Sequence, residues 1–353
     1  MTTAKRIEWI DVAKGLGLFL VVIGHSMTTP IRDASFLCYA IYTAIYFFHM
    51  PFMFYLSGRT FGMAEKRYAS MNTGEFVKKK AKQLLVPYVI YGILVYLIFS
   101  MANSVPNLNR ILENAGYGKQ SIVDWSYGTL IGDNLYAYHL WFIYGLFLAT
   151  IFSYLIKKYI KNSNWILFII AIIFLVIRVY VNTSYWGIVN LIMKCYLWFV
   201  VGTYFDFSKV IGKLWSIFWQ GFSLVYLFFV AINFNGWNGY SGTLLYEMIK
   251  WIADVGLLML FVHIAILLKG LLKGFFSYTG KRSYGIYLFH QPFFASGGGL
   301  VLYKVMGIPL IITVPFTIVM CYIFPVLFLK ILDTKYGNYL KPYLLGTPRK
   351  KRG

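Results

Sequence analysis

Three ionisable residues, Asp11, Lys14 and His25, lie in one apolar stretch near the start of this 353-residue chain. An α-helix has 3.6 residues per turn, so the steps from Lys14 to His25 make nearly whole turns. Both side chains then share one face, about 16 Å apart along the axis, and Asp11 lies within about 40° of it. Ionisable groups in a membrane span are costly and usually face a bundle interior or a wet cavity. The spacing predicts one helix face with a cation near one end and an imidazole near the other.

The imidazole of His25 is the first candidate for catalysis. A neutral imidazole accepts a proton near neutral pH, which is the chemistry of a general base. A single histidine near a helix end can instead hydrogen-bond across helices in a structural role. The presence of Lys14 and Asp11 on the same face favours the catalytic interpretation.

Two further histidines, His49 and His290, occur in the repeated phrase Phe-His-x-Pro-Phe. Pro51 removes one helical donor and should free the carbonyl of Phe47 beside His49. Two such phrases in helices of opposite direction also fit an inverted repeat, as transporters have, or chance in an aromatic-rich chain. Both histidines are candidate second members of a catalytic group.

A third set of candidates is His139 and Trp141, at the start of a later apolar run. The predicted orientation places His139 on the same side as His25, where it could contact an acceptor or simply lie at the membrane interface. Together with Asp11, these two residues are the predicted acceptor-binding group.

The elements that must position these residues are membrane helices. Apolar residues make up 59% of the chain and aromatic residues 20%. Nearly every stretch between charged clusters is an apolar run of about 18–25 residues, the length of a transmembrane helix. We therefore predict an all-α integral membrane protein with about ten spans: 9–26, 36–62, 82–103, 136–156, 164–181, 186–205, 214–232, 244–268, 283–303 and 307–329.

The net charge of +21 follows from topology rather than from nucleic-acid binding, because most of the 33 Lys and Arg residues fall in alternate loops. Basic loops remain on the cytoplasmic side of a membrane, so both termini should be cytoplasmic. We assign residues 1–335 to a transmembrane domain and residues 336–353 to a basic cytoplasmic tail.

Cations also gather at the predicted cytoplasmic depth, where Lys14, Arg59 and Arg282 could hold the phosphates of an anionic ligand. Snorkelling to lipid headgroups is the alternative for Arg282. Three cysteines without metal-ligand spacing predict no metal site, and no nucleotide-binding loop is present. The charges at 247, 250 and 254 should face the bundle interior, without an assigned role.

Several phrases, in order along the chain, resemble the acyltransferase-3 family of multi-pass bacterial membrane acyltransferases, which includes fucose 4-O-acetylase-like proteins. The likeness covers roughly residues 6–330, and its strongest part is a basic residue followed by ten residues and a histidine, here Lys14 and His25. The matching phrases are Asp11-Val-Ala-Lys14-Gly, Gly24-His25-Ser26, Phe48-His49-Met-Pro51, Leu56-Ser57-Gly58, Leu84-Leu85-Val86-Pro87-Tyr88, Leu140-Trp141-Phe142, Val201-Gly202-Thr-Tyr204 and Ser283-Tyr284-Gly285-Ile286-Tyr287-Leu-Phe-His290.

The resemblance implies O-acylation, usually O-acetylation, of a cell-surface glycan or its lipid-linked precursor, with cytosolic acetyl-CoA as acyl donor. It implies a multi-pass protein of the bacterial cell membrane, and direct transfer or transfer through a separate extracellular partner enzyme. It also implies essential roles for Lys14 and His25. Two other functions fit the residues alone: export of a glycan or lipid-linked sugar, and a non-catalytic sensor or anchor for a partner enzyme.

Overall fold

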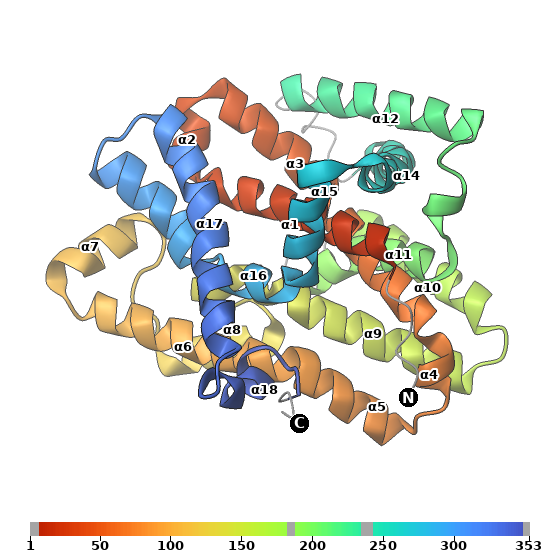
Figure 1. Cartoon of the computed structure of the whole chain (residues 1–353), viewed down its shortest axis with the longest axis horizontal. Helices are drawn as coiled ribbons and strands as arrows, with labels where there is room; N and C mark the ends of the chain where they lie inside the picture. Colours follow the sequence, from red (N-terminus) through yellow and green to blue (C-terminus); the bar gives the residue numbers. More distant parts are fainter. Residues whose placement is uncertain (1–6, 182–187, 234–242, 349–353) are drawn as a thin grey trace.

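The computed structural model describes residues 7–181, 188–233 and 243–348, and the regular structure in these ranges is helical, as predicted. Figure 1 shows the arrangement of the helices. The long helices are α1 (Glu8–Ser26), α3 (Phe36–Met63), α6 (Val86–Asn103), α9 (Trp141–Tyr159), α10 (Ser163–Tyr180), α11 (Ile188–Tyr204), α12 (Leu214–Ile232), α14 (Leu244–Leu267), α15 (Gly270–Lys281) and α17 (Leu310–Leu332). The shorter helices are α2 (Thr29–Ala34), α4 (Glu65–Ala69), α5 (Thr73–Lys80), α7 (Pro106–Asn114), α8 (Ile122–Ile131), α16 (Ser283–Phe289) and α18 (Lys341–Leu344).

Short 3-10 and π segments join these helices. They are η1 (Ala81–Leu85), η2 (Leu135–Leu140), η4 (Phe207–Lys209), η5 (Phe293–Gly297), η6 (Leu300–Val305) and η7 (Gly337–Tyr339). Segment η1 links α5 to α6 as one continuous helical stretch, and η2 leads directly into α9.

Within the described ranges, eight helical stretches are long and apolar enough to cross a membrane. They are Glu8–Ser26, Phe36–Met63, Thr73–Asn103, Ile122–Tyr159, Ser163–Tyr180, Leu214–Ile232, Leu244–Leu267 and Leu310–Leu332. The protein is therefore a multi-pass membrane protein.

The two remaining predicted spans differ from continuous membrane helices. The predicted span 186–205 begins outside the described residues, and its described part, α11, has 17 residues. The predicted span 283–303 is interrupted, because α16 ends at Phe289 and the chain continues through η5 and η6. Tyr91 donates a hydrogen bond to the carbonyl of Gln291 at this break, and backbone at membrane depth needs such partners.

Helix α1 is the central helix of the bundle. Figure 1 shows it crossing the middle of the molecule, where it packs against α3, α14, α15, α16 and α17. In its 18-residue apolar window, 67% of the residues are buried, the highest share among the eight candidate spans. Its position places the side chains of α1 against the interior of the protein rather than against lipid.

Helices α3 and α11 pack with their backbones in direct contact. A Cβ atom on Gly58 would lie 1.9 Å from the carbonyl oxygen of Phe199, and one on Gly202 would lie 2.0 Å from that of Tyr55. Small residues allow this close approach, on which helix association in a membrane depends.

The contact predicts that Gly58→Ala destabilises the protein by about 3 kcal/mol, because the added methyl group must push two helix backbones apart. Thermal unfolding of the detergent-solubilised protein measures the effect. Gly221→Ala on α12 is the matched control, since no atom lies within 4 Å of that Cβ position. Equal unfolding midpoints for the two variants would contradict the packing described.

The carbonyl of Phe47 is freed by Pro51 as predicted, and the ammonium of Lys250 occupies it with a 2.6 Å hydrogen bond. Lys250 also pairs with Asp254 at 2.8 Å. Glu247, one turn earlier on α14, pairs with Arg178 of α10 at 2.8 Å. These charges are buried and tie α14 to its neighbours, which agrees with the predicted inward orientation.

Candidate functional site

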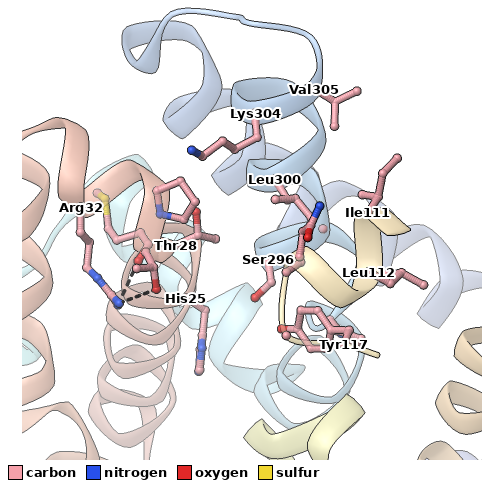
Figure 2. A pocket seen from close by; sticks show the side chains of 18 of the residues that line it. His25, Thr28, Arg32, Ile111, Leu112, Tyr117, Ser296, Leu300, Lys304 and Val305 are labelled. Atoms are coloured by element: carbon pink, nitrogen blue, oxygen red, sulfur yellow. Dashed lines mark hydrogen bonds between the residues drawn. The ribbon is translucent and has the colours of Figure 1, made fainter. Parts of the chain in front are cut away.

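A cavity of about 870 Å³ lies beside the last turn of α1, and we call it the His25 pocket. Its polar lining includes Arg32 of α2, Tyr46 of α3, Ser296 of η5 and Lys304 of η6. Figure 2 shows His25 on one side of this space and Ser296 and Tyr117 on the other. The predicted base therefore faces a cavity large enough for a sugar-sized group.

Four histidines, which we call the histidine cluster, gather at this end of α1: His25, His49, His139 and His290. The ring centroid of His290 lies 5.3 Å from that of His25 and 5.6 Å from that of His139. Tyr46 joins His49 to the group, with its ring 4.8 Å from His49 and its hydroxyl 3.4 Å from Nδ1 of His25. Residues predicted from separate spans thus meet at one place.

Hydrogen bonds to backbone carbonyls fix which ring nitrogen carries the proton, because a carbonyl can only accept. His49 Nδ1 donates to Ile45 at 2.8 Å, and His290 Nδ1 donates to Tyr287 at 2.6 Å. His139 Nε2 donates to Leu288 at 3.3 Å. The opposite nitrogens keep their lone pairs, and in the described structure Nε2 of His290 is buried without a hydrogen-bond partner.

A second cavity, of about 330 Å³, lies beside Lys14, and we call it the Lys14 pocket. Three cations, Lys14, Arg67 and Lys80, line it, together with Tyr68, and no described carboxylate is among its lining residues. Burial alone would raise the pKa of the Tyr68 hydroxyl, but Lys80 and Arg67 outweigh burial and hold it below its ordinary value. This pocket suits an anion.

The two predicted cations besides Lys14 lie elsewhere. Arg59 pairs with Asp206 at 2.8 Å, and Arg282 stacks on the ring of Tyr278 and donates to its carbonyl. Neither lines the Lys14 pocket. Although burial raises the pKa of Asp206, hydrogen bonds from Ser208 and Arg59 hold it below its ordinary value, so the Arg59 pair is a fixed structural contact.

The remaining predicted residues, Asp11 and Trp141, are buried in this structure. Asp11 is 4% exposed and lies in the interior against α15, where its backbone oxygen meets Gly280. Trp141 begins α9 and stacks on Phe54 with ring centroids 6.3 Å apart. Neither residue lines the His25 pocket, whereas Tyr46, Ser296 and Lys304, which sequence reasoning did not single out, do.

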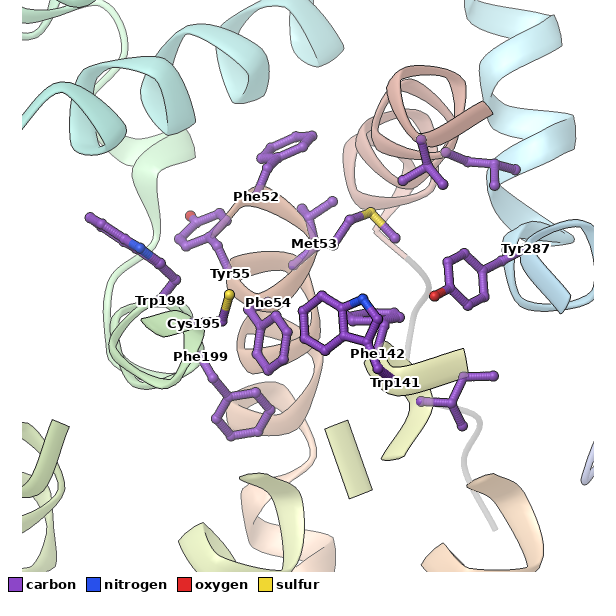
Figure 3. Packing of buried hydrophobic residues seen from close by; sticks show 14 of the residues in the cluster. Phe52, Met53, Phe54, Tyr55, Trp141, Phe142, Cys195, Trp198, Phe199 and Tyr287 are labelled. Atoms are coloured by element: carbon purple, nitrogen blue, oxygen red, sulfur yellow. The ribbon is translucent and has the colours of Figure 1, made fainter. Parts of the chain in front are cut away.

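The two pockets share no lining residue, and the rings of Tyr287 and His290 lie between them as a partition. Tyr287 lines the Lys14 pocket, and its ring lies 5.6 Å from that of His290 and 5.4 Å from that of Phe142. The Tyr287 hydroxyl donates to the carbonyl of His139. Figure 3 shows Tyr287 pointing toward Phe142 and Met53. On its other side, the His290 ring lies 5.3 Å from that of His25, which lines the His25 pocket.

A family model described as an acyltransferase domain matches residues 7–330, nearly the whole chain. The chain belongs to this acyltransferase family. The predicted resemblance is thereby confirmed, and the protein is a multi-pass membrane acyltransferase. Comparisons with curated proteins and with solved structures give no match.

For a membrane acyltransferase, the arrangement supplies two kinds of chemistry at the two ends of α1. The Lys14 pocket offers ammonium and guanidinium donors, which bind phosphate oxygens through charge-assisted hydrogen bonds. The His25 pocket offers an imidazole with a hydroxyl partner, the arrangement of a general base held by an orienting group. Tyr287 of this acyltransferase lies between them.

Arg67, Lys80 and Tyr287 are the site residues that sequence reasoning missed. Lys80 and Arg67 belong to a basic segment whose charge is already explained by its predicted cytoplasmic location. Their charge therefore gave no separate indication of a binding pocket. Tyr287 precedes His290 by three residues and therefore shares its helix face, which was the available signal.

Proposed function

We propose that this acyltransferase moves an acyl group, most simply acetyl, from cytosolic acyl-CoA to a hydroxyl of a cell-surface or lipid-linked glycan. The observation that carries the proposal is the placement of a cationic pocket and an imidazole pocket at opposite ends of one buried helix. Acyl-CoA is a phosphorylated cytosolic donor, and a glycan hydroxyl needs a base, so each pocket suits one substrate.

On the donor side, Lys14, Arg67 and Lys80 hold the phosphates of acyl-CoA at the cytoplasmic end of the bundle. The apolar and aromatic residues deeper in the same pocket, including Met53 and Phe142, receive the pantetheine arm and its thioester. For the acyl carbon to reach His25, Tyr287 must move aside, because its ring lies between the Lys14 pocket and His290.

On the acceptor side, His25 takes the proton of the attacking hydroxyl on Nε2 while Nδ1 donates to the oxygen of Tyr46, 3.4 Å away. Tyr46 is then a positioning residue that selects the reactive tautomer. The buried lone pair of His290 Nε2, next to the His25 ring, makes His290 the second basic group of the site.

The reaction balances with these groups alone. The hydroxyl oxygen forms a bond to the thioester carbonyl carbon as His25 removes its proton, and the carbon–sulfur bond breaks when the intermediate collapses. The proton held by His25 passes to the leaving thiolate, so the imidazole is neutral again at the end of each turnover. The product is an ester, and free CoA returns to the cytosol.

A comparison of surface polysaccharide from a deletion strain and its parent tests this function. We expect the deletion strain to make and display the polymer normally but to lack the ester acetyl signals in the proton NMR spectrum. Polymer retained inside the cell would instead indicate an exporter, and an unchanged spectrum with normal display would indicate a sensor or anchor. Either of these results would contradict the proposal.

A further inference from the structure

A third cavity, of about 650 Å³, opens beside the His25 pocket. It lies between α6, α7, η5, η6 and α17, and all of its described lining residues are apolar. Ile98, Val301 and Phe316 at its margin are 46–48% exposed, so it opens to the side of the molecule. A polar ligand would gain nothing from such a surface, whereas a hydrocarbon chain would.

This apolar cavity is continuous with the site. Seven residues line both it and the His25 pocket, among them Phe99, Pro292 and Leu300. Figure 2 shows Leu300, Ile111 and Leu112 on the side of the pocket opposite His25. A ligand with a tail in the apolar cavity therefore has its head group in the His25 pocket.

Two cations line the His25 pocket, Arg32 on the side of His25 and Lys304 on η6, the segment shared with the apolar cavity. The Arg32 guanidinium donates to Thr29 Oγ1 at 2.9 Å and lies over the ring of Tyr42 at 4.0 Å, which holds it in place. Lys304 is exposed on η6, the segment that also lines the apolar cavity, and Figure 2 shows its side chain pointing toward the Arg32 side of the pocket. Asp33 is the single carboxylate in the described lining, so cations predominate.

We propose that the acceptor is a lipid-linked sugar with a polyisoprenoid tail joined through phosphate. The tail enters sideways from the membrane into the apolar cavity, the phosphate pairs with Lys304 and Arg32, and a sugar hydroxyl reaches His25. This inference rests on the proposed function and chooses among its acceptor classes. A hydrocarbon tail on the acyl donor would use the apolar cavity alone, and it would leave the two cations without a matching charge.

Photolabelling of the full-length protein in phosphatidylcholine nanodiscs tests the inference without turnover. The probe is a polyisoprenyl phosphate carrying a diazirine, and mass spectrometry locates the label. We expect labelling on α6 and η6, with a decrease of about tenfold in Ala102→Phe, which fills the apolar cavity, and in Lys304→Gln, which removes a phosphate contact. Leu97→Phe, exposed to lipid on the same helix, and Lys330→Gln, exposed on α17, should label as the wild type does.

Two results would overturn the inference. One is equal labelling of wild type and Ala102→Phe, and the other is equal labelling of the same residues by a diazirine phosphatidylcholine or by polyisoprenol without phosphate. Turnover is measured separately, as ester acetate on the surface polysaccharide of cells that express the same variants, because the probe carries no sugar hydroxyl; this measurement keeps the two proposals apart. Labelling that meets the expectation in a protein without turnover would contradict the proposed function alone, and turnover without the expected labelling would contradict the lipid-linked acceptor alone.

Discussion

Replacement of His25 by alanine is expected to lower acyl transfer to the glycan by about 10²–10⁴-fold, the usual contribution of a positioned general base. His25 is the histidine of the cluster that lines the 870 Å³ pocket, and its neighbours His49, His139 and His290 are buried behind it. The measurement is ester acetate on surface polysaccharide, together with release of free CoA by the purified protein.

A matched control for His25→Ala exists on α14. His263 hydrogen-bonds Gln220 at 3.0 Å and lines neither the His25 pocket nor the Lys14 pocket. His263→Ala should therefore retain transfer, and both variants should reach wild-type levels in the membrane. Transfer by His25→Ala within about twofold of wild type would remove His25 from the mechanism.

The double variant Arg67→Gln, Lys80→Gln should raise KM for acetyl-CoA by roughly 100-fold, because two charge-assisted phosphate contacts are lost. Both side chains line the Lys14 pocket, and Lys80 also donates to the Tyr68 hydroxyl at 3.0 Å. With acetyl-pantetheine, a donor without phosphates, wild type and variant should have equal kcat/KM. The comparison separates phosphate binding from a general loss of the fold.

Arg59→Gln serves as the control for the cationic pocket. Its guanidinium pairs with Asp206 outside the Lys14 pocket, so we expect a lower unfolding temperature and an unchanged KM for acetyl-CoA. A large increase in KM for Arg59→Gln, with none for the double variant, would place the donor phosphates near Arg59 instead.

Much of the architecture follows from sequence patterns that depend on one helix at a time. Apolar run length predicted the all-helical membrane fold. Helical periodicity predicted an inward orientation of Lys14 and His25, and each of them lines a pocket. Proline chemistry predicted the free carbonyl of Phe47, although the identity of its partner, Lys250, depended on how α14 packs.

The features that escaped prediction depend on how separate helices meet. The two Phe-His-x-Pro-Phe phrases read alike, yet His49 lies in the unbroken helix α3 while His290 follows the end of α16. Composition alone could not separate Arg67 and Lys80, which line a pocket, from Arg59, which pairs with Asp206. Ion pairing within the bundle decides which cations remain available to a ligand, and pairing is a property of the tertiary structure.

The position of Tyr287, Phe142 and His290 between the two pockets has a consequence for the membrane potential. A continuous aqueous path beside His25 and Lys14 would let protons and ions leak across the membrane. Each elementary charge that crosses a potential of 100 mV dissipates about 2.3 kcal/mol. With the rings in place, the two pockets share no lining residue, and the rings of Tyr287 and His290 lie between them. A gate of aromatic side chains would let an uncharged acyl group cross while the proton-motive force is preserved.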